Sequence, residues 1–333
     1  MIQTSIVIPV YNRPEELREL LDSLTLQHDI DKTEVVVVED GSMKTSEEVV
    51  SQFERQLNIR YIRQENTGPA VARNNGAKAA KGEFLYFFDS DCILPAGFME
   101  AIEPAMNIED ADCIGTADHS HPYFTPIQKA ISYSMTSVFT TGGIRGGSSA
   151  KMDSFFPRSY SMGVRRSVFE AVGGFANMRY GEDVDLSMRI KEAGYKLWLV
   201  RETYVYHKRR TNFKSFFKQT FCSGTARIDL SLRHPGTLKL VHVLPTVAVI
   251  MLIALIVLAI VAHWGFAIPL AIYAGVIFID SLRKERDVWV AMLSIVSSAI
   301  QICGYGLGFL YNVWVRLILG RRDAVAFRNT LYD

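Results

Sequence analysis

Apolar runs alternate with helix-like segments over roughly the first 210 residues of the chain. The run SIVIPVY (residues 5–11) predicts a buried strand, and after Pro14 leucines recur at i, i+3, i+4 and i+7, which predicts an amphipathic helix. A second helix is predicted at residues 68–82, closed by Gly82. Three more apolar runs predict strands: residues 34–42, 59–64 and 83–91. Strands that are apolar on both faces and alternate with helices predict an α/β fold with a largely parallel sheet.

The pattern changes in the C-terminal third of the chain. Residues 244–262 contain no charge and are long enough to form a transmembrane helix. A second apolar stretch begins at Gly265, and a third runs uncharged over residues 288–315. Three such runs in succession predict membrane attachment, and buried helices of a soluble core are the less favoured alternative.

The number of membrane crossings stays open. After two crossings the basic loop RKERD (residues 283–287) would lie in the cytosol, as the positive-inside rule favours, but a third crossing would place Arg316 and the basic tail outside. The third stretch contains Gly304, Gly306 and Gly308. It is therefore either a third span or a broken, re-entrant hairpin that returns the tail to the cytosol.

Charge and cysteine content exclude few classes of function. The 36 basic and 35 acidic residues give a net charge of +1, so no global field indicates a nucleic-acid partner. The four cysteines are far apart and form no CxxC pair, which indicates neither a disulfide framework nor a structural zinc site. Met1 leads almost directly into the first strand without a basic and apolar leader, so we expect the N-terminal unit to stay in the cytosol.

Two carboxylates follow the strand predicted at residues 83–91, at Asp-x-Asp spacing. Asp89 and Asp91 lie where that strand ends, and Asp40 ends an earlier strand. Parallel sheets bind ligands at the carboxyl ends of their strands, and paired carboxylates there can hold Mg²⁺ or Mn²⁺ shared with substrate phosphates. By spacing alone, an ordinary turn with solvated acids is an equal alternative.

A second acidic group occurs in GEDVDL (residues 181–186), where Glu182, Asp183 and Asp185 begin a predicted helix. A helix N-terminus favours acids electrostatically, so helix capping is one explanation. A carboxylate close to an acceptor hydroxyl can also serve as the general base that removes its proton, and this functional interpretation is favoured.

These segments together resemble a known enzyme family. SIVIPVYNRPEELRELLDSL, VVVVEDGS, NTGPAVARNNGAKAAKGEFLYFFDSD, GGF and GEDVDL are similar, in order and spacing, to motifs of family 2 glycosyltransferases with the GT-A fold. The resemblance implies a nucleotide-diphospho-sugar transferase domain with a Rossmann-like mixed sheet at residues 1–210. Basic residues alternate with aromatic ones over residues 208–233, which favours amphipathic interfacial helices, placed at 211–240. Two to three transmembrane helices at 241–318 and a basic tail at 319–333 follow, and this part is similar to membrane-anchored members that build exopolysaccharides or other surface glycans.

The resemblance implies a role for individual residues. Asp183 would be the catalytic base, and Glu182 would orient the acceptor or the base. The metal would be held by Asp91 together with Asp89 and His207, although a lone histidine is often structural. The donor nucleotide would be bound by Pro9, Tyr11, Asn12, Arg13, Asp40, Arg73 and Asp89. The chain departs from the usual pair of aspartates in having Glu39 before Asp40.

The resulting functional hypothesis is an inverting glycosyltransferase that depends on Mg²⁺ or Mn²⁺. It would move a sugar from a nucleotide-sugar donor, a UDP-sugar first, to a hydroxyl of a lipid-linked or glycan acceptor, from the cytoplasmic side of the plasma or inner membrane. Its partners would be donor, acceptor and membrane lipid, with no nucleic acid. The alternatives are a polyprenyl-phosphate sugar synthase and a non-catalytic membrane protein that binds nucleotide sugars. The acids at 182 and 183 favour the first, because a phosphate acceptor needs little base assistance.

Overall fold

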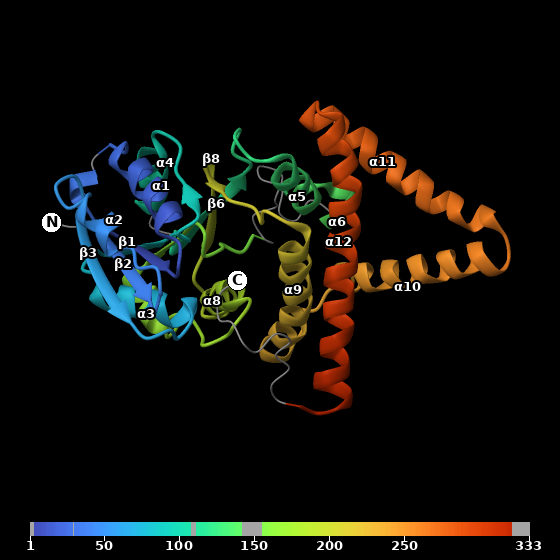
Figure 1. Ribbon diagram of the computed structural model, residues 1–333. Helices are drawn as coiled ribbons and strands as arrows, with labels where there is room; N and C mark the ends of the chain where they lie inside the picture. The colour runs from blue at the N-terminus through green and yellow to red at the C-terminus, as the bar shows by residue number, and fades with distance from the viewer. Residues whose placement is uncertain (1–2, 29, 108–110, 142–154, 322–333) are drawn as a thin grey trace. The chain divides into compact units, whose positions relative to one another are not determined.

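The computed structural model describes residues 3–28, 30–107, 111–141 and 155–321, which form two compact units (Figure 1). The described part of the first unit comprises residues 3–121 and 155–208, and that of the second comprises 122–141 and 209–321. Residues 122–141 thus pack with the second unit, an arrangement that the hydrophobic pattern does not indicate.

The first unit is built on an eight-stranded mixed sheet with the strand order β3-β2-β1-β4-β7-β6-β8-β5. The strands are β1 (Thr4–Val10), β2 (Thr33–Asp40), β3 (Asn58–Gln64), β4 (Phe84–Phe87), β5 (Cys92–Ile93), β6 (Cys113–His119), β7 (Met162–Arg165) and β8 (Leu197–His207). The first four strands in this order are parallel, β7 is antiparallel to both β4 and β6, and β6 and β8 are again parallel. The predicted mixed sheet of the GT-A type is confirmed.

Helices cover both faces of this sheet, so its central strands are apolar on both sides. They are α1 (Pro14–Thr25), α2 (Glu47–Ser51), α3 (Pro69–Ala79), α4 (Phe98–Met106), α7 (Arg166–Ala171) and α8 (Glu182–Glu192). Successive strand residues point to opposite faces. Accordingly Ile6 and Ile8 belong to the core under α1, α2 and α4, whereas Val7 belongs to the core under α3, α7 and α8.

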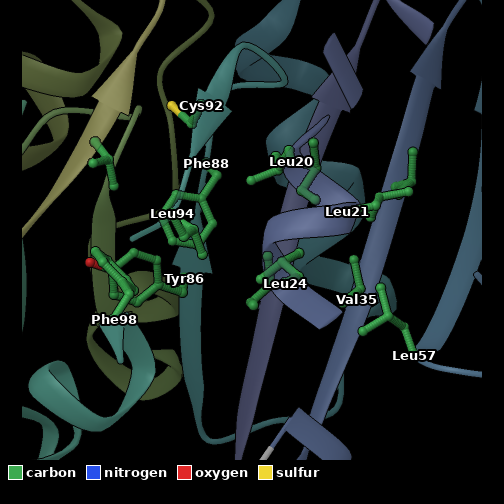
Figure 2. Close-up of a cluster of buried hydrophobic side chains, with 14 of the residues drawn as sticks. Leu20, Leu21, Leu24, Val35, Leu57, Tyr86, Phe88, Cys92, Leu94 and Phe98 are labelled. Carbon is green, nitrogen blue, oxygen red and sulfur yellow. The ribbon is translucent and has the colours of Figure 1, made fainter. Parts of the chain in front are cut away.

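The end of β4 is held firmly by aromatic packing (Figure 2). Tyr86 and Phe88 are fully buried with ring centroids 4.7 Å apart, and Phe98 from α4 meets both edge-on at 5.9 and 5.6 Å. Such pairs stabilise a core beyond their burial alone. Asp89 therefore follows a rigid strand end.

The second unit is helical. Its elements are α5 (Pro126–Thr136), α6 (Val138–Thr141), α9 (Phe213–Arg233), α10 (Leu240–Val261), a 3₁₀ turn (Trp264–Ala267), α11 (Ile268–Glu285), α12 (Val288–Val313) and a π-helical turn (Trp314–Ile318). Three helical segments are long and apolar enough to cross a membrane: Leu240–Val261, Trp264–Glu285 and Val288–Ile318. Most of the basic tail predicted at 319–333 lies outside the described residues.

Of the two alternatives left open for the third apolar stretch, the broken, re-entrant hairpin is wrong, because α12 runs without interruption through its glycines. These glycines instead permit close helix packing. A Cβ atom at Gly308 would overlap the carbonyl oxygen of Phe221 in α9, and one at Gly306 would lie 2.8 Å from the carbonyl oxygen of Pro245 in α10. The missing side chains let neighbouring backbones approach α12 directly.

This packing generates a stability prediction. We expect Gly308→Ala to lower the thermal midpoint of the detergent-solubilised protein, because relieving the overlap with Phe221 costs about 1–3 kcal/mol. Gly275→Ala in α11 is the matched control, since a Cβ there meets no atom within 4 Å. Equal midpoints for the two variants, measured by thermal denaturation, would contradict the close approach of α9 and α12.

Candidate active site

Three neighbouring parallel strands bring their carboxyl ends to one edge of the sheet. β1 lies between β2 and β4, so Asp40 at the end of β2 and Asp89 just beyond β4 flank the loop that follows β1. This edge is where open α/β sheets bind ligands.

Asp40 is fully buried and orders the loop that leads into α3. One of its carboxylate oxygens accepts hydrogen bonds from the Thr67 backbone N–H at 2.9 Å and the Gln64 side chain at 2.6 Å. The other accepts from the Gly68 backbone N–H at 2.8 Å. Its role toward a donor base stays a prediction.

Glu39 is an anchor whose role the sequence interpretation missed. Its carboxylate is 1 % exposed and accepts hydrogen bonds from the Ser46 backbone N–H at 2.7 Å and the Tyr61 hydroxyl at 2.9 Å. Burial and the Glu39 charge raise the pKa of Tyr61, which keeps that hydroxyl a donor. The available signal was a charged side chain inside an otherwise apolar strand, which needs partners when buried.

The loop after β1 is shaped by Asn12, which has a left-handed φ of 54°. Its side-chain oxygen accepts hydrogen bonds from the Met43 and Lys44 backbone N–H groups at 2.9 and 3.0 Å. Arg13 donates to Asp91 Oδ2 at 2.6 Å. Pro9 lies buried within β1 and Tyr11 directly follows that strand, so their contacts with a donor stay a prediction.

Arg73 of α3 joins the two acidic groups that the sequence singles out. Its guanidinium is 4 % exposed and forms ion pairs with Asp89 Oδ1 at 2.5 Å and Glu182 Oε1 at 3.0 Å. The same guanidinium lies over the Phe175 ring, 5.4 Å from its centroid. The residue predicted to touch the donor thus links the Asp-x-Asp segment directly to the start of α8.

The Gly-Gly-Phe turn is fastened between α3 and α8. The Asn74 side chain donates to the Phe175 carbonyl at 2.8 Å and accepts from the Phe175 N–H at 2.9 Å. Arg189 of α8 donates to the Gly174 carbonyl at 2.6 Å and is held by buried Asp185 at 2.8 Å. Gly174 has a φ of +68°, and a Cβ would lie 2.7 Å from Asn74 Oδ1. The turn therefore requires glycine and fixes α8 beside Asp89.

Glu182 and Asp183 have different surroundings. Burial, followed by the neighbouring Asp183 charge, raises the pKa of Glu182 to about 7, although Arg73 opposes this shift. Asp183 accepts from the Val184 backbone N–H at 2.7 Å, and its Oδ1 is 3.7 Å from Arg158 Nη1. The helix N-terminus and Arg158 favour a negative charge at Asp183.

Asp91 and His207 offer converging metal-ligand atoms. The pairing of β5 with β8 places Cys92 opposite His207, and His207 Nε2 is 3.3 Å from Asp91 Oδ1. The imidazole stacks on Tyr160 with centroids 4.9 Å apart, and its Nδ1 is 4.0 Å from Asp118 Oδ2.

One potential ligand atom each from Asp91, Cys92 and His207 lies within 4.8 Å of the others. Burial raises the pKa of the Cys92 thiol well above its usual value, and a neutral thiol is a poor ligand. The carboxylate of Asp91 suits Mg²⁺ or Mn²⁺ and His207 adds a nitrogen donor, whereas the soft sulfur of Cys92 is a ligand that such hard cations do not favour.

The sheet and its strand-end acids define a transferase of the GT-A type. Residues 5–173, which are 169 of the 333, match the family model described as glycosyl transferase family 2. The chain therefore belongs to this family.

Relatives with curated names agree with this assignment. The chain is 30% identical over 242 residues to glycosyltransferase AglE of Haloferax volcanii, a match that spans 68% of the chain and 73% of AglE. It is 25% identical over 331 residues to the succinoglycan biosynthesis protein ExoA of Rhizobium meliloti, spanning 95% and 96%. The protein is thus a glycosyltransferase.

A solved structure shares the fold. The mannosyltransferase PcManGT from Pyrobaculum calidifontis, in complex with GDP-Man and Mn²⁺, has a TM-score of 0.63 at 18% sequence identity, with 94% of this chain and 88% of that chain covered.

The buried acid Glu182 generates a pH prediction. Its folded pKa of about 7 exceeds the ordinary value of 4.5, so the folded protein binds this proton more tightly than the unfolded chain. This proton binding stabilises the folded state fully at pH values below 4.5, and the stabilisation is lost as the pH rises through about 7. We expect Glu182→Gln, which stays neutral, to gain roughly 1–3 kcal/mol relative to wild type between about pH 5 and pH 8.

The measurement is denaturation of both proteins across this pH range. Glu192→Gln, at the exposed end of the same helix, is the matched control for replacing one glutamate of α8 by glutamine. A constant stability difference between Glu182→Gln and wild type at every pH would contradict the raised pKa.

Proposed function

We propose that the protein is an inverting, metal-dependent glycosyltransferase that moves a sugar from a nucleotide-sugar donor to a hydroxyl of a membrane-associated glycan or lipid-linked acceptor. The observation that carries the proposal is the Arg73 bridge, which joins Asp89 of the Asp-x-Asp segment to Glu182 beside Asp183. The buried Arg73 guanidinium thereby holds together Asp89, which we assign to the donor side, and Glu182, which we assign to the acceptor side. The GDP-Man and Mn²⁺ bound to PcManGT support a nucleotide-sugar donor and a divalent cation here. A UDP-sugar is our first candidate from the family resemblance alone.

In the proposed reaction Asp183 takes the proton from the acceptor hydroxyl. The oxygen attacks the anomeric carbon from the face opposite the nucleoside diphosphate, the bond from that carbon to the phosphate oxygen breaks, and the configuration inverts. Glu182, fixed by Arg73, orients the acceptor or Asp183. Asp91 and His207, with Asp89 nearby, would hold Mg²⁺ or Mn²⁺, which neutralises charge on the diphosphate when bound.

We assign donor binding to the residues at the carboxyl edge of the sheet: Pro9, Tyr11, Asn12, Arg13, Asp40, Arg73 and Asp89. The protein is further proposed to be a multi-pass membrane protein with this unit on the cytoplasmic side. The three apolar helices support attachment, and the basic residues Arg283, Lys284 and Arg286 after the second support this orientation.

The direct test is release of nucleoside diphosphate by detergent-purified protein from a panel of UDP- and GDP-sugars, with and without Mn²⁺ or Mg²⁺ and a lipid extract. We expect release from one donor, dependent on metal and increased by lipid. If no donor is bound or cleaved under any condition, the protein is a non-catalytic member of its family.

Asp183→Asn should reduce turnover by about 10²–10⁴-fold, because the amide cannot accept the acceptor proton. Donor affinity, measured by calorimetry, should stay within a few-fold of wild type. Glu192→Gln on the same helix serves as the control with unchanged turnover. Turnover of Asp183→Asn within a few-fold of wild type would show that another group is the base.

Asp91→Ala and His207→Ala should each weaken Mn²⁺ binding at least about 10-fold, measured on the donor-free protein by electron paramagnetic resonance of free Mn²⁺. Cys92→Ser is the matched control, because sulfur is too soft a ligand to contribute much to Mn²⁺ binding. An unaltered Mn²⁺ titration for Asp91→Ala would show that Asp91 is not a metal ligand.

A further inference from the structure

The three apolar helices of the second unit differ in how much of their surface the protein itself covers. Inside the protein, 39% of the apolar window of Val288–Ile318 is buried, against 11% for Leu240–Val261 and for Trp264–Glu285. The third segment is therefore partly a core helix, whereas the other two present nearly all of their apolar surface outward.

α12 packs along α9 in a parallel direction, as Figure 1 shows. Gly304 lies against Thr220, Gly308 against Phe221, and Gly224 against the backbone at Tyr305. Further along both helices, the Asn312 side chain donates to the Thr225 carbonyl at 2.6 Å, and Arg316 Nε pairs with Asp229 Oδ1 at 2.9 Å. From Thr220 to Asp229 this contact extends about 14 Å along α9 at 1.5 Å per residue.

α9 is too polar to cross the hydrocarbon core of a bilayer. It carries five charged residues: Lys214, Lys218, Arg227, Asp229 and Arg233. Two helices packed in parallel share the same depth, and the contact of Thr220 with Gly304 puts Lys214 and Lys218 level with the middle of α12. An upright α12 would therefore carry both lysines into the bilayer. Charged side chains at that depth are strongly disfavoured.

The first half of α12 also has a polar neighbour. Ser297 Oγ donates to the Ala130 carbonyl of α5 at 2.7 Å. α5 begins with a capping box formed by Thr125 and Gln128, and its Tyr133 hydroxyl donates to Asp280 Oδ2 at 2.7 Å. α12 is thus flanked by polar helices near both ends.

α10 and α11 leave α12 at two separate points and meet again at their far ends. Thr246 of α10 donates to the Gly306 carbonyl at 3.3 Å, and Ser281 of α11 donates to Ser294 Oγ at 2.8 Å. These two contacts are 12 residues apart on α12, or about 18 Å. Since the turn Trp264–Ala267 joins the other ends, α12 is the base of a triangle whose sides are α10 and α11 (Figure 1).

We infer that only α10 and α11, among the described helices, penetrate the bilayer, as a hairpin, and that α12 lies in the membrane plane beside α9. This rests on the membrane attachment proposed above. The outward face of α12 would rest on the acyl chains, through Trp289, Met292, Val296, Leu307, Leu310 and Trp314. The chain after α12 would then stay on the side of α9, which places Arg316 and Arg321 with the basic residues 283–286, as the positive-inside rule favours.

The test is a depth profile from single spin-labelled cysteines, read by collision with oxygen in the lipid and with a water-soluble nickel chelate. Cys303→Ser is the background, because the other three cysteines are buried. Labels at 296, 307 and 314 on α12 should report one shallow depth, whereas labels at 250, 253 and 257 on α10 should become progressively deeper with distance from the contact of Thr246 with α12. An α12 profile that is deepest in its middle and shallow at both ends would overturn the inference.

A second measurement gives the side of the tail. Lys239→Cys, before α10, and Leu319→Cys, after α12, are both exposed positions. In sealed vesicles an impermeant maleimide should label both or neither, and labelling of one alone would overturn the inference. Neither measurement needs catalysis, so loss of the proposed activity would leave this result standing. If alkaline carbonate extracted the protein from membranes, the protein would not be inserted in the bilayer, and both the proposed membrane attachment and this inference would be wrong.

Discussion

The site depends on a buried guanidinium that cannot be left without counter-charges. Arg73 is almost fully buried, and an isolated charge in that position would be strongly destabilising. Asp89 and Glu182 compensate it from two separate elements, and Phe175 covers its face. Because each carboxylate satisfies the same cation, the end of β4 and the start of α8 cannot move apart without exposing an uncompensated charge.

Other polar anchors fix the loops around this pair in the same way. Asp40 and Glu39 each use a buried carboxylate to hold backbone N–H groups of a following loop. Asn74, adjacent to Arg73, ties the Gly-Gly-Phe turn to α3. Such bonds are costly to break, because a buried group left without its partner loses its hydration as well. The sheet supplies a rigid base, and buried polar groups position the loops upon it.

Periodicity predicted the first four strands and the helices after β1 and β3, since those strands are apolar on both faces and the helices have clear start signals. It could not predict which carboxylate meets Arg73, because the two partners are 16 and 109 residues away along the chain. The hydrophobic pattern also did not show that the protein buries more of the third apolar stretch than of the other two. Hydropathy depends on composition alone. The glycines of α12 are needed because the backbones of α9 and α10 approach that helix closely, which only the structure shows. The same glycines that suggested a break are what let the helix pack as one piece.

Charge balance gives a physical reason to expect a divalent cation. Four carboxylates, from Asp89, Asp91, Glu182 and Asp183, face three guanidinium groups, from Arg13, Arg73 and Arg158. These guanidinium groups are already engaged by the acids, so they supply no spare positive charge for a diphosphate. A nucleoside diphosphate adds about two negative charges, which Mg²⁺ or Mn²⁺ typically offsets by binding carboxylate and phosphate together. Arg13 already contacts Asp91 Oδ2, while Asp91 Oδ1 faces His207. Donor binding without added cation would leave the diphosphate beside these acids, which supports the proposed metal dependence on electrostatic grounds alone.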